Sequence, residues 1–347
     1  MTAAASTTAE VLSVHDLVRH YSLGGGLPGR PRTRVPAVDG VSFTIPAGTT
    51  MALVGESGCG KSTTAKLILQ LERPDRGEVR LQGERVDGAS RASLNRLRRN
   101  VQMVFQDPYA SLTPHLRVDA ILGEPFKVHR ICKAGEIAAR VAGLIESVGL
   151  SADVGRRFPH ELSGGQRQRI GIARALAVEP ALVICDEPVS ALDVSIRSQI
   201  VNLLLDLQAS RGLAYLFISH DLGLVEHMSD SVAVMYLGRI VETAPASTFF
   251  AGPRHPYSAA LLASSPTPDP RQRGRPAALR GEIASLVNLP SGCRFRTRCP
   301  LAIARCAESE PVLLPVGRGH LVACHRGEEM AGAAALPARP RSDPTGG

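Results

Sequence analysis

The sequence of 347 residues predicts an α/β domain built on a mostly parallel sheet, followed by a C-terminal segment of different architecture. Residues 181–185 and 215–219 are apolar runs of the kind that form strands covered on both faces. Between them, residues from about 194 to 209 repeat apolar side chains at helical spacing. Strands that alternate with helices are typical of parallel sheets. Proline and glycine become dense after residue 250, which indicates a change of architecture near 255–265.

The N-terminal part of the chain also predicts strands followed by a helix. Residues 11–50 predict short strands joined by a turn-rich insert at 22–36, which is full of glycine, proline and arginine. An apolar run at 51–54 precedes a glycine-rich turn and then a helical pattern that begins near Lys61. This pattern places Leu67, Ile68 and Leu71 on one side of the helix.

We therefore expect one α/β domain between two less structured ends. The expected segments are a flexible N-terminus over 1–10, the α/β domain over 11–255 with a helical subdomain at about 105–170, a C-terminal extension over 256–327, and a disordered tail over 328–347.

Composition and charge narrow the function classes. No stretch approaches the run of about 18 apolar residues that a membrane-spanning helix needs, and residues 1–10 lack the pattern of a secretion signal. We therefore expect a soluble chain that reaches a membrane only through a partner. The net charge of +8 favours anionic partners in principle. Because aromatics make up 4% of the residues and do not interleave with the basic ones, we expect no nucleic-acid partner.

A phosphate-binding loop lies between the apolar run at 51–54 and the helix that follows. The segment 55–62 matches the pattern Gly-x4-Gly-Lys-Ser/Thr (Walker A) in the required context. Glycines let the backbone N–H groups face the phosphates, and the helix N-terminus adds a favourable dipole. Lys61 is expected on the β- and γ-phosphates and Ser62 on Mg²⁺. The predicted nucleotide-binding residues are Gly55, Glu56, Ser57, Gly58, Cys59, Gly60, Lys61, Ser62 and Thr63.

Cys59 lies inside this loop. A small tolerated side chain is one interpretation, and a thiol with a pKa lowered by the nearby helix N-terminus is the other. The second interpretation predicts that a thiol reagent inactivates the protein and that ATP protects it.

A phosphate loop alone also fits kinases, GTPases and helicases, and a second motif narrows the class of nucleotide-binding protein. It consists of Leu162, Ser163, Gly164, Gly165 and Gln166. Some twenty residues later an apolar strand ends at Asp186 and Glu187. With these motifs in this order, residues 11–265 closely resemble the ABC ATPase family. The resemblance implies an ABC-type P-loop nucleotide-binding domain with a mostly parallel sheet core, an antiparallel β subdomain and an α-helical signature subdomain, followed by a small cysteine-containing C-terminal extension. It also implies that residues 162–166 form a signature motif, and that Ser163 and Gly165 of one subunit close on the ATP held by another.

The end of the apolar strand has the residues for hydrolysis. Asp186 is suited to hold Mg²⁺ directly or through water, and Glu187 is placed to act as general base on the attacking water. The resemblance implies that Gln106 is the Q-loop glutamine, which contacts Mg²⁺ and water. It also implies that His220 is the switch histidine at the γ-phosphate.

Two further roles rest on the same resemblance. Ser190 and Asp193 are the first and last residues of a segment similar to the D-loop, which links the two ATP sites. Tyr21 resembles the A-loop aromatic that stacks on adenine, and a surface tyrosine is the alternative interpretation.

Three segments resemble the oligopeptide/dipeptide importers. Residues 106–112 are similar to the segment where a transmembrane coupling helix docks, and residues 254–263 resemble the start of the C-terminal extension of these ATPases. The cysteine-rich tail resembles its end. The amino-acid sequence of residues 186–193 and the basic insert at 22–36 resemble the second, F-type ATPase of such systems.

The resemblance implies an ATP-hydrolysing subunit that energises peptide import from the cytoplasmic face of the cell membrane. Its expected partners are two transmembrane permease subunits, a second ABC ATPase or a second copy of this chain, and an extracytoplasmic solute-binding protein. Importers of nickel, opines or glutathione remain alternatives. A soluble ABC ATPase acting on nucleic acid or ribosomes is a remote one, because the chain has one set of motifs and no long insertion.

Four of the seven cysteines lie in the C-terminal segment: Cys293, Cys299, Cys306 and Cys324. In a reducing cytosol such clustering indicates metal binding rather than disulfides. The closely spaced cysteine pairs typical of structural zinc sites are missing. Resemblance to the family's tail permits a [4Fe–4S] cluster on these thiolates, and plain thiols in a structured tail are the alternative.

Overall fold

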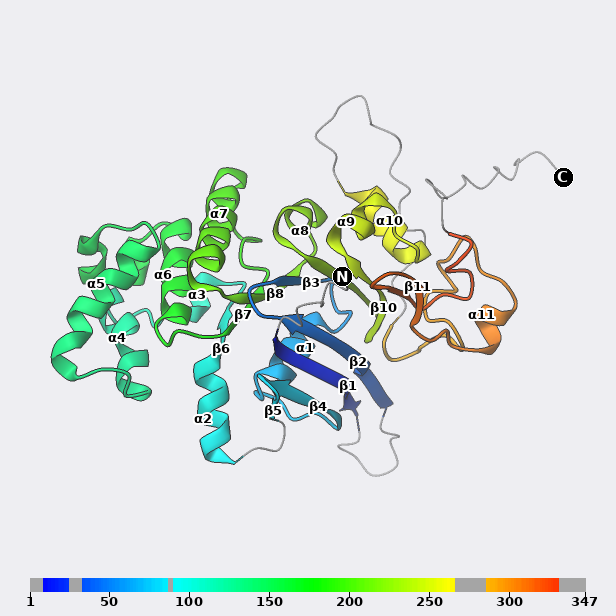
Figure 1. Ribbon diagram of the computed structural model, residues 1–347, viewed down its shortest axis with the longest axis horizontal. Helices are drawn as coiled ribbons and strands as arrows, with labels where there is room; N and C mark the ends of the chain where they lie inside the picture. The colour runs from blue at the N-terminus through cyan, green and yellow to red at the C-terminus, as the bar shows by residue number, and fades with distance from the viewer. Residues whose placement is uncertain (1–8, 25–32, 87–89, 266–284, 331–347) are drawn as a thin grey trace, which may run out of the picture.

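The computed structural model describes residues 9–24, 33–86, 90–265 and 285–330. Within these residues the chain forms two sheets with helix α1 (Lys61–Ile68) between them (Figure 1). The α/β class and the mostly parallel core that the sequence predicts are confirmed. Most of the predicted flexible N-terminus and most of the predicted tail lie outside the described residues.

The larger sheet has the strand order β11-β12-β10-β9-β3-β8-β7-β6. Its centre is parallel, because β3 pairs in parallel with both β8 and β9, and β7 pairs in parallel with β8 and β6. These strands are β3 (Thr50–Val54), β6 (Val101–Val104), β7 (Leu182–Asp186), β8 (Ala214–Ser219) and β9 (Ser231–Tyr236). All residues of β3, β7 and β8 are buried, which explains their continuous apolar sequences.

The C-terminal extension continues this sheet. Strand β10 (Arg239–Pro245) pairs antiparallel with β9 and also with β12 (His320–Val322), which in turn pairs with β11 (Leu314–Gly317). The extension also contains the short helix α11 (Arg305–Glu308). The segment that we expected to follow the α/β domain therefore shares its sheet.

The smaller sheet is antiparallel, in the order β2-β1-β4-β5. Its strands are β1 (Glu10–Leu23), β2 (Thr33–Pro46), β4 (Arg76–Leu81) and β5 (Glu84–Arg85). The short strands expected over 11–50 are two strands of 14 residues each, whose pairing is interrupted by several register shifts. Part of the insert expected at 22–36 lies outside the described residues, and its two flanks belong to β1 and β2.

Helices cover the other face of the large sheet. Helix α6 (Gly164–Leu176), α7 (Val194–Arg211) and α8 (Leu222–Met228) pack there, and α9 (Ala246–Ala251) and α10 (Pro256–Ser264) lie toward the extension (Figure 1). Helices α3 (Pro108–Ser111), α4 (Val118–Val128) and α5 (Ile137–Ser147) form a helical region at one end, while α2 (Arg91–Asn100) precedes β6. Among the described residues, no helix combines the length and apolar content needed to cross a bilayer.

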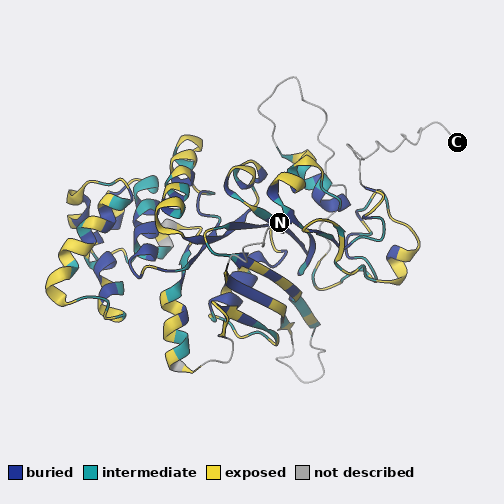
Figure 2. Cartoon of the chain, viewed as in Figure 1, coloured by how far each residue is buried: buried dark blue, intermediate teal, exposed yellow. Residues whose placement is uncertain are grey.

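Two hydrophobic cores lie on opposite faces of the large sheet (Figure 2). One fills the space between that sheet, α1 and the antiparallel sheet. The other joins the helical region, α6, α7 and α8 to the extension, where Tyr257 and Phe295 are buried. Leu71 is 58% exposed, contrary to its predicted place on the buried side, because α1 ends at Ile68.

Candidate active site

The phosphate loop connects β3 to α1, as predicted. Its backbone is tightly curled, with φ values of +153° at Gly55 and +114° at Gly60. A Cβ atom at Gly60 would lie 2.2 Å from the Ala37 carbonyl oxygen, and one at Gly55 would lie 2.2 Å from that of Met235. Both positions therefore require glycine for the conformation and for the close approach of neighbouring backbone.

Lys61 is almost completely buried at the first position of α1. Its Nζ donates to the carbonyl oxygens of Gly55 at 2.8 Å and of Glu56 at 3.0 Å. The ammonium group is thus held within the curl of the loop, where the backbone N–H groups of a helix N-terminus favour anions.

Ser62 and Asp186 meet at the edge of the large sheet. The Ser62 hydroxyl donates to Asp186 Oδ1 at 3.2 Å. Burial raises the pKa of Asp186; the Ser62 hydrogen bond opposes this shift and the charge of Glu187 adds to it. A carboxylate beside a hydroxyl offers the oxygen ligands that Mg²⁺ prefers, so these residues fit the metal that the sequence predicts.

Glu187, His220 and Gln106 also come together. Glu187 Oε1 lies 3.1 Å from His220 Nδ1, and Glu187 Oε2 accepts a hydrogen bond from Gln106 Nε2 at 2.9 Å. The three residues follow β7, β8 and β6, which are parallel neighbours whose carboxyl ends share one edge. Glu187 has a φ of +47°, a left-handed conformation that is uncommon outside glycine and concentrated at functional sites.

The signature residues begin helix α6. Ser163 Oγ accepts the N–H of Gln166 at 3.3 Å, and Gln166 Oε1 accepts the N–H of Ser163 at 3.0 Å, which forms a capping box. Leu162 is buried beneath this turn. A Cβ at Gly165 would lie 2.7 Å from Ile196 Cγ2 of α7, so a larger residue there would require Ile196 to shift.

The signature residues are separated from the phosphate loop of the same chain. Figure 1 shows α6 within the helical layer and α1 beneath the sheet. In the described residues, no hydrogen bond joins 162–166 to 55–63. The segment after Glu187 lies next to the cluster of Gln106, Glu187 and His220 instead, because Ser190 Oγ donates to the Glu187 carbonyl at 3.1 Å. Asp193 stands at the N-cap of α7.

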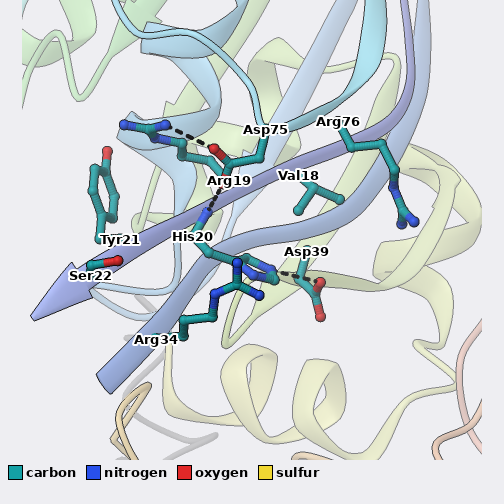
Figure 3. Close-up of a pocket in the computed structure, with 9 residues that line it drawn as sticks. All are labelled: Val18, Arg19, His20, Tyr21, Ser22, Arg34, Asp39, Asp75 and Arg76. Carbon is teal, nitrogen blue, oxygen red and sulfur yellow. Dashed lines mark hydrogen bonds and ion pairs between the residues drawn. The ribbon is translucent and has the colours of Figure 1, made fainter. Parts of the chain in front are cut away.

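Tyr21 lies near the start of α1. Its hydroxyl donates to Glu72, and its pKa is raised by burial and by Glu72, with Thr63 opposing the shift through a hydrogen bond. The residue borders a pocket of about 730 Å³, in which His20 turns toward Asp39 and Arg19 toward Asp75 (Figure 3). The Arg19 guanidinium lies 5.1 Å from the Tyr21 ring centroid. Adenine stacking on this ring stays a prediction.

The interpretation of Cys59 as an activated thiol is wrong. The residue is 3% exposed and belongs to the core beneath the loop. Burial raises the pKa of its thiol, and the charge and hydrogen bonds of Lys61 only partly oppose this. Proximity to the helix N-terminus was visible in the sequence, but the direction of the side chain was not.

The four C-terminal cysteines are free thiols within electrostatic reach of one another. Burial raises the pKa of Cys293 and of Cys299 to about 11, and the neighbouring thiols add to both shifts. Within the described residues, which include all four, no group of three or more His, Cys, Asp or Glu side chains is arranged to hold a metal ion. The iron–sulfur cluster stays a prediction without structural support.

Two residues at the phosphate loop were missed by the sequence interpretation. The Tyr257 hydroxyl accepts the Glu56 N–H at 2.8 Å. Arg298 donates to both carboxylate oxygens of Glu56, at 2.7 and 2.9 Å. No local pattern could indicate contacts between residues more than 200 positions apart.

Comparisons with known proteins agree with this geometry. The profile of the ABC transporter family matches residues 38–190, and that of the oligopeptide/dipeptide transporter C-terminal region matches 241–306. The probable peptide ABC transporter ATP-binding protein y4tS of Sinorhizobium fredii is 49% identical over 91% of this chain and 89% of its own length. The oligopeptide transport ATP-binding protein AppF of Bacillus subtilis is 46% identical over 94% of this chain and 99% of its own.

Solved structures show the same fold. The dimeric ATP-binding cassette MJ0796, in a post-hydrolysis state bound to ADP and Pi, superposes with a TM-score of 0.60 at 25% identity, over 68% of this chain and 98% of its own. CbiO1 of Clostridium perfringens, part of an ABC transporter complex, gives 0.62 at 29% identity, over 70% of this chain and 91% of its own. The chain therefore belongs to the ATP-hydrolysing subunits of ABC transporters, in the branch that carries the oligopeptide/dipeptide C-terminal region.

Proposed function

We propose that this chain hydrolyses ATP to power the import of peptides, or of solutes of similar size, across the cell membrane. The observation that carries the proposal is the meeting of Gln106, Glu187 and His220 next to the Ser62–Asp186 pair. Relatives named for peptide transport match over nearly the whole chain. ABC transporters for nickel, opines or glutathione remain alternatives for the solute.

In the proposed mechanism, Lys61 and the loop N–H groups would bind the phosphates, and Ser62 and Asp186 would hold Mg²⁺, which would supply charge neutralisation. Glu187 accepts, as general base, the proton of the water that attacks the γ-phosphorus, while the bond from that phosphorus to the β-phosphate oxygen breaks and ADP leaves. The Gln106 amide and the His220 ring hold the Glu187 carboxylate in place before the reaction. Such preorganisation lowers the cost of reaching the transition state.

The signature residues act on a second subunit in this proposal. Ser163 and the first N–H groups of α6 form a helix N-terminus, a type of site that binds phosphate. Because this terminus is remote from its own phosphate loop, it is free to close on ATP held by another subunit. ATP then favours a closed pair of subunits, and hydrolysis allows the pair to open.

The membrane partners would dock beside the Q-loop. Phe105 and Tyr109 are 41% and 63% exposed there and offer apolar contact area to a partner. The Tyr109 ring is held by the Arg167 guanidinium, which lies 3.5 Å from the ring centroid. We infer two permease subunits, a second ATPase or a second copy of this chain, and an extracytoplasmic solute-binding protein, with this chain at the cytoplasmic face.

Purification of the tagged chain from gently solubilised membranes tests the proposal. Two multispanning proteins and an ATPase are expected to copurify, and ATP turnover of the assembly should rise when the peptide-loaded binding protein is added. The variant Tyr109→Arg should still bind ATP but lose the membrane partners. Recovery of ribosomes or DNA in place of membrane proteins would overturn the transport function.

A [4Fe–4S] cluster on Cys293, Cys299, Cys306 and Cys324 is a separate prediction for the extension. Iron and acid-labile sulfide in an anaerobic preparation would support it. Their absence would leave these residues as plain thiols.

A further inference from the structure

The C-terminal region reaches into the phosphate loop at Glu56. Tyr257, in α10, accepts the backbone N–H of this residue at 2.8 Å. Arg298, in the extension, holds both oxygens of its carboxylate at 2.7 and 2.9 Å. The backbone and the side chain of one loop residue are therefore both fixed by segments that follow the ATPase domain.

Both contacting groups are rigidly held. Tyr257 is fully buried, and the Arg298 side chain is 4% exposed. Their surroundings are aromatic: Tyr236 lies 4.6 Å from Tyr257 and 5.3 Å from Phe295 between ring centroids. A bidentate arginine–carboxylate pair has a fixed geometry, so this packing also fixes where Glu56 lies.

The electrostatics of the phosphate loop make the Glu56–Arg298 pair important for ATP binding. Glu56 is the one acidic residue in the segment 55–63, which otherwise favours anions. An unpaired carboxylate there would repel the phosphates of ATP, most strongly where it is shielded from water. Arg298 neutralises this charge through its two hydrogen bonds to the carboxylate.

The contacts of Tyr257 and Arg298 with Glu56 also support the phosphate loop when Lys61 binds the phosphates. In this structure Lys61 Nζ bonds to the carbonyl groups of Gly55 and Glu56. A lysine that turns to the phosphates gives up at least part of these bonds. Tyr257 and Arg298 hold Glu56 independently of Lys61, so they can preserve the loop conformation in the bound state.

We propose that Tyr257 and Arg298 are positioning residues for ATP, and that the C-terminal region acts as a clamp that sets the affinity of the phosphate loop. This inference rests on the proposed function only in requiring that the loop binds ATP. It assigns the region a role in nucleotide binding within its own subunit.

Arg298→Met and Tyr257→Phe test the clamp in the purified full-length chain. The dissociation constant of Mg-ATP is measured by displacement of a fluorescent ATP analogue. Arg298→Met should weaken binding about tenfold, because it leaves an uncompensated carboxylate beside the phosphates. Tyr257→Phe removes one hydrogen bond at constant ring size and should weaken binding about threefold to fivefold.

Two further variants separate positioning from general docking. In Glu56→Gln/Arg298→Met the repelling charge is gone, so affinity should return to within about threefold of wild type. Arg294→Met is the matched control. Arg294 also ties the extension to the ATPase domain, through Asp39 and the Leu237 carbonyl, but does not touch Glu56. It should lower the unfolding temperature and leave ATP affinity within about twofold.

The outcomes are distinguishable. Wild-type affinity in both Arg298→Met and Tyr257→Phe would overturn the clamp alone, as would an equal loss in Arg294→Met. A double variant as weak as Arg298→Met would overturn the charge argument. Failure of the wild-type chain itself to bind ATP would overturn the proposed function, and the clamp with it. In the assembled transporter, Arg298→Met should raise KM for ATP and change kcat by less than about twofold.

Discussion

The Glu187 carboxylate lies 3.1 Å from Nδ1 of His220. The other carboxylate oxygen accepts a hydrogen bond from the Gln106 amide at 2.9 Å, so both carboxylate oxygens have partners. The backbone of Glu187 contributes as well, because its left-handed φ of +47° directs the residue out of the strand that ends at Asp186. In the general-base role proposed for Glu187, a carboxylate held in this way needs little reorganisation when water attacks.

Glu187→Gln is expected to separate binding from hydrolysis. The amide cannot accept the proton of water, so turnover should fall by about 10²–10⁴-fold, the range typical of a lost general base. ATP binding should persist, since Lys61 and Ser62 are unchanged. Phosphate release measures turnover, and size-exclusion chromatography with Mg-ATP should show a trapped pair of subunits. Near-normal turnover in this variant would remove the proposed role of Glu187.

The placement of Asp186, Glu187 and His220 at one edge of the sheet was predictable from the sequence, because these residues directly follow apolar strands. Asp186 and Glu187 come after one apolar run, and His220 comes after another. Parallel pairing then brings these strand ends to one edge without further information. Short motifs next to strongly patterned strands are therefore where sequence interpretation succeeds.

Sequence interpretation fails for the contacts that the C-terminal extension makes. Glu242 of β10 contacts His320 of β12 at 2.7 Å and accepts the N–H groups of Arg254 and His255. Arg298 reaches Glu56 across 242 positions of the chain. These contacts depend on how distant segments pack, and the local sequence around either residue of a contact does not indicate the other residue. The long bulged strands β1 and β2 were missed for a related reason, because their register shifts are set by pairing.

Ser163 should have two separable functions. It caps α6, and in the proposal it meets the phosphate held by a second subunit. Ser163→Ala removes the cap and should cost about 1 kcal/mol of stability. Ser163→Asp keeps a capping oxygen but adds a negative charge next to that phosphate. It should therefore keep wild-type stability and lose more than about tenfold in turnover.

Urea unfolding and the ATPase rate of the assembled transporter measure these two effects. Normal hydrolysis by Ser163→Asp would contradict the contact between subunits. A large loss of stability in the same variant would instead contradict the capping geometry.

Cys59 is expected to be slow toward thiol reagents. Its thiol is buried and its pKa is raised, so the reactive thiolate is scarce in the folded chain. Modification by N-ethylmaleimide should be at least about tenfold slower than in the urea-unfolded chain. Peptide mapping after timed exposure measures the rate, with the half-buried Cys132 as an internal comparison. Fast modification of Cys59 that ATP prevents would restore the activated-thiol interpretation.

Stability should fall in mildly acid solution because of His255. This residue is 1% exposed, and its Nδ1 accepts the Tyr257 N–H at 3.1 Å at the start of α10. Burial lowers the pKa of His255 to about 4, with the charge of Glu242 opposing the shift. Since the unfolded value is 6.5, the unfolded chain binds a proton that the folded chain excludes between pH 6.5 and 4. The contribution is complete above pH 6.5 and is lost as the pH falls through this window, by at most about 1.4 kcal/mol per pH unit.

His255→Asn replaces the capping ring nitrogen with a capping oxygen and removes the titration, so the stability of this variant should depend less on pH. Urea unfolding of both proteins between pH 7.5 and 5 tests this, and the difference between them isolates His255 from His320, which also faces Glu242. Parallel pH curves for the two proteins would show that His255 does not titrate in this window.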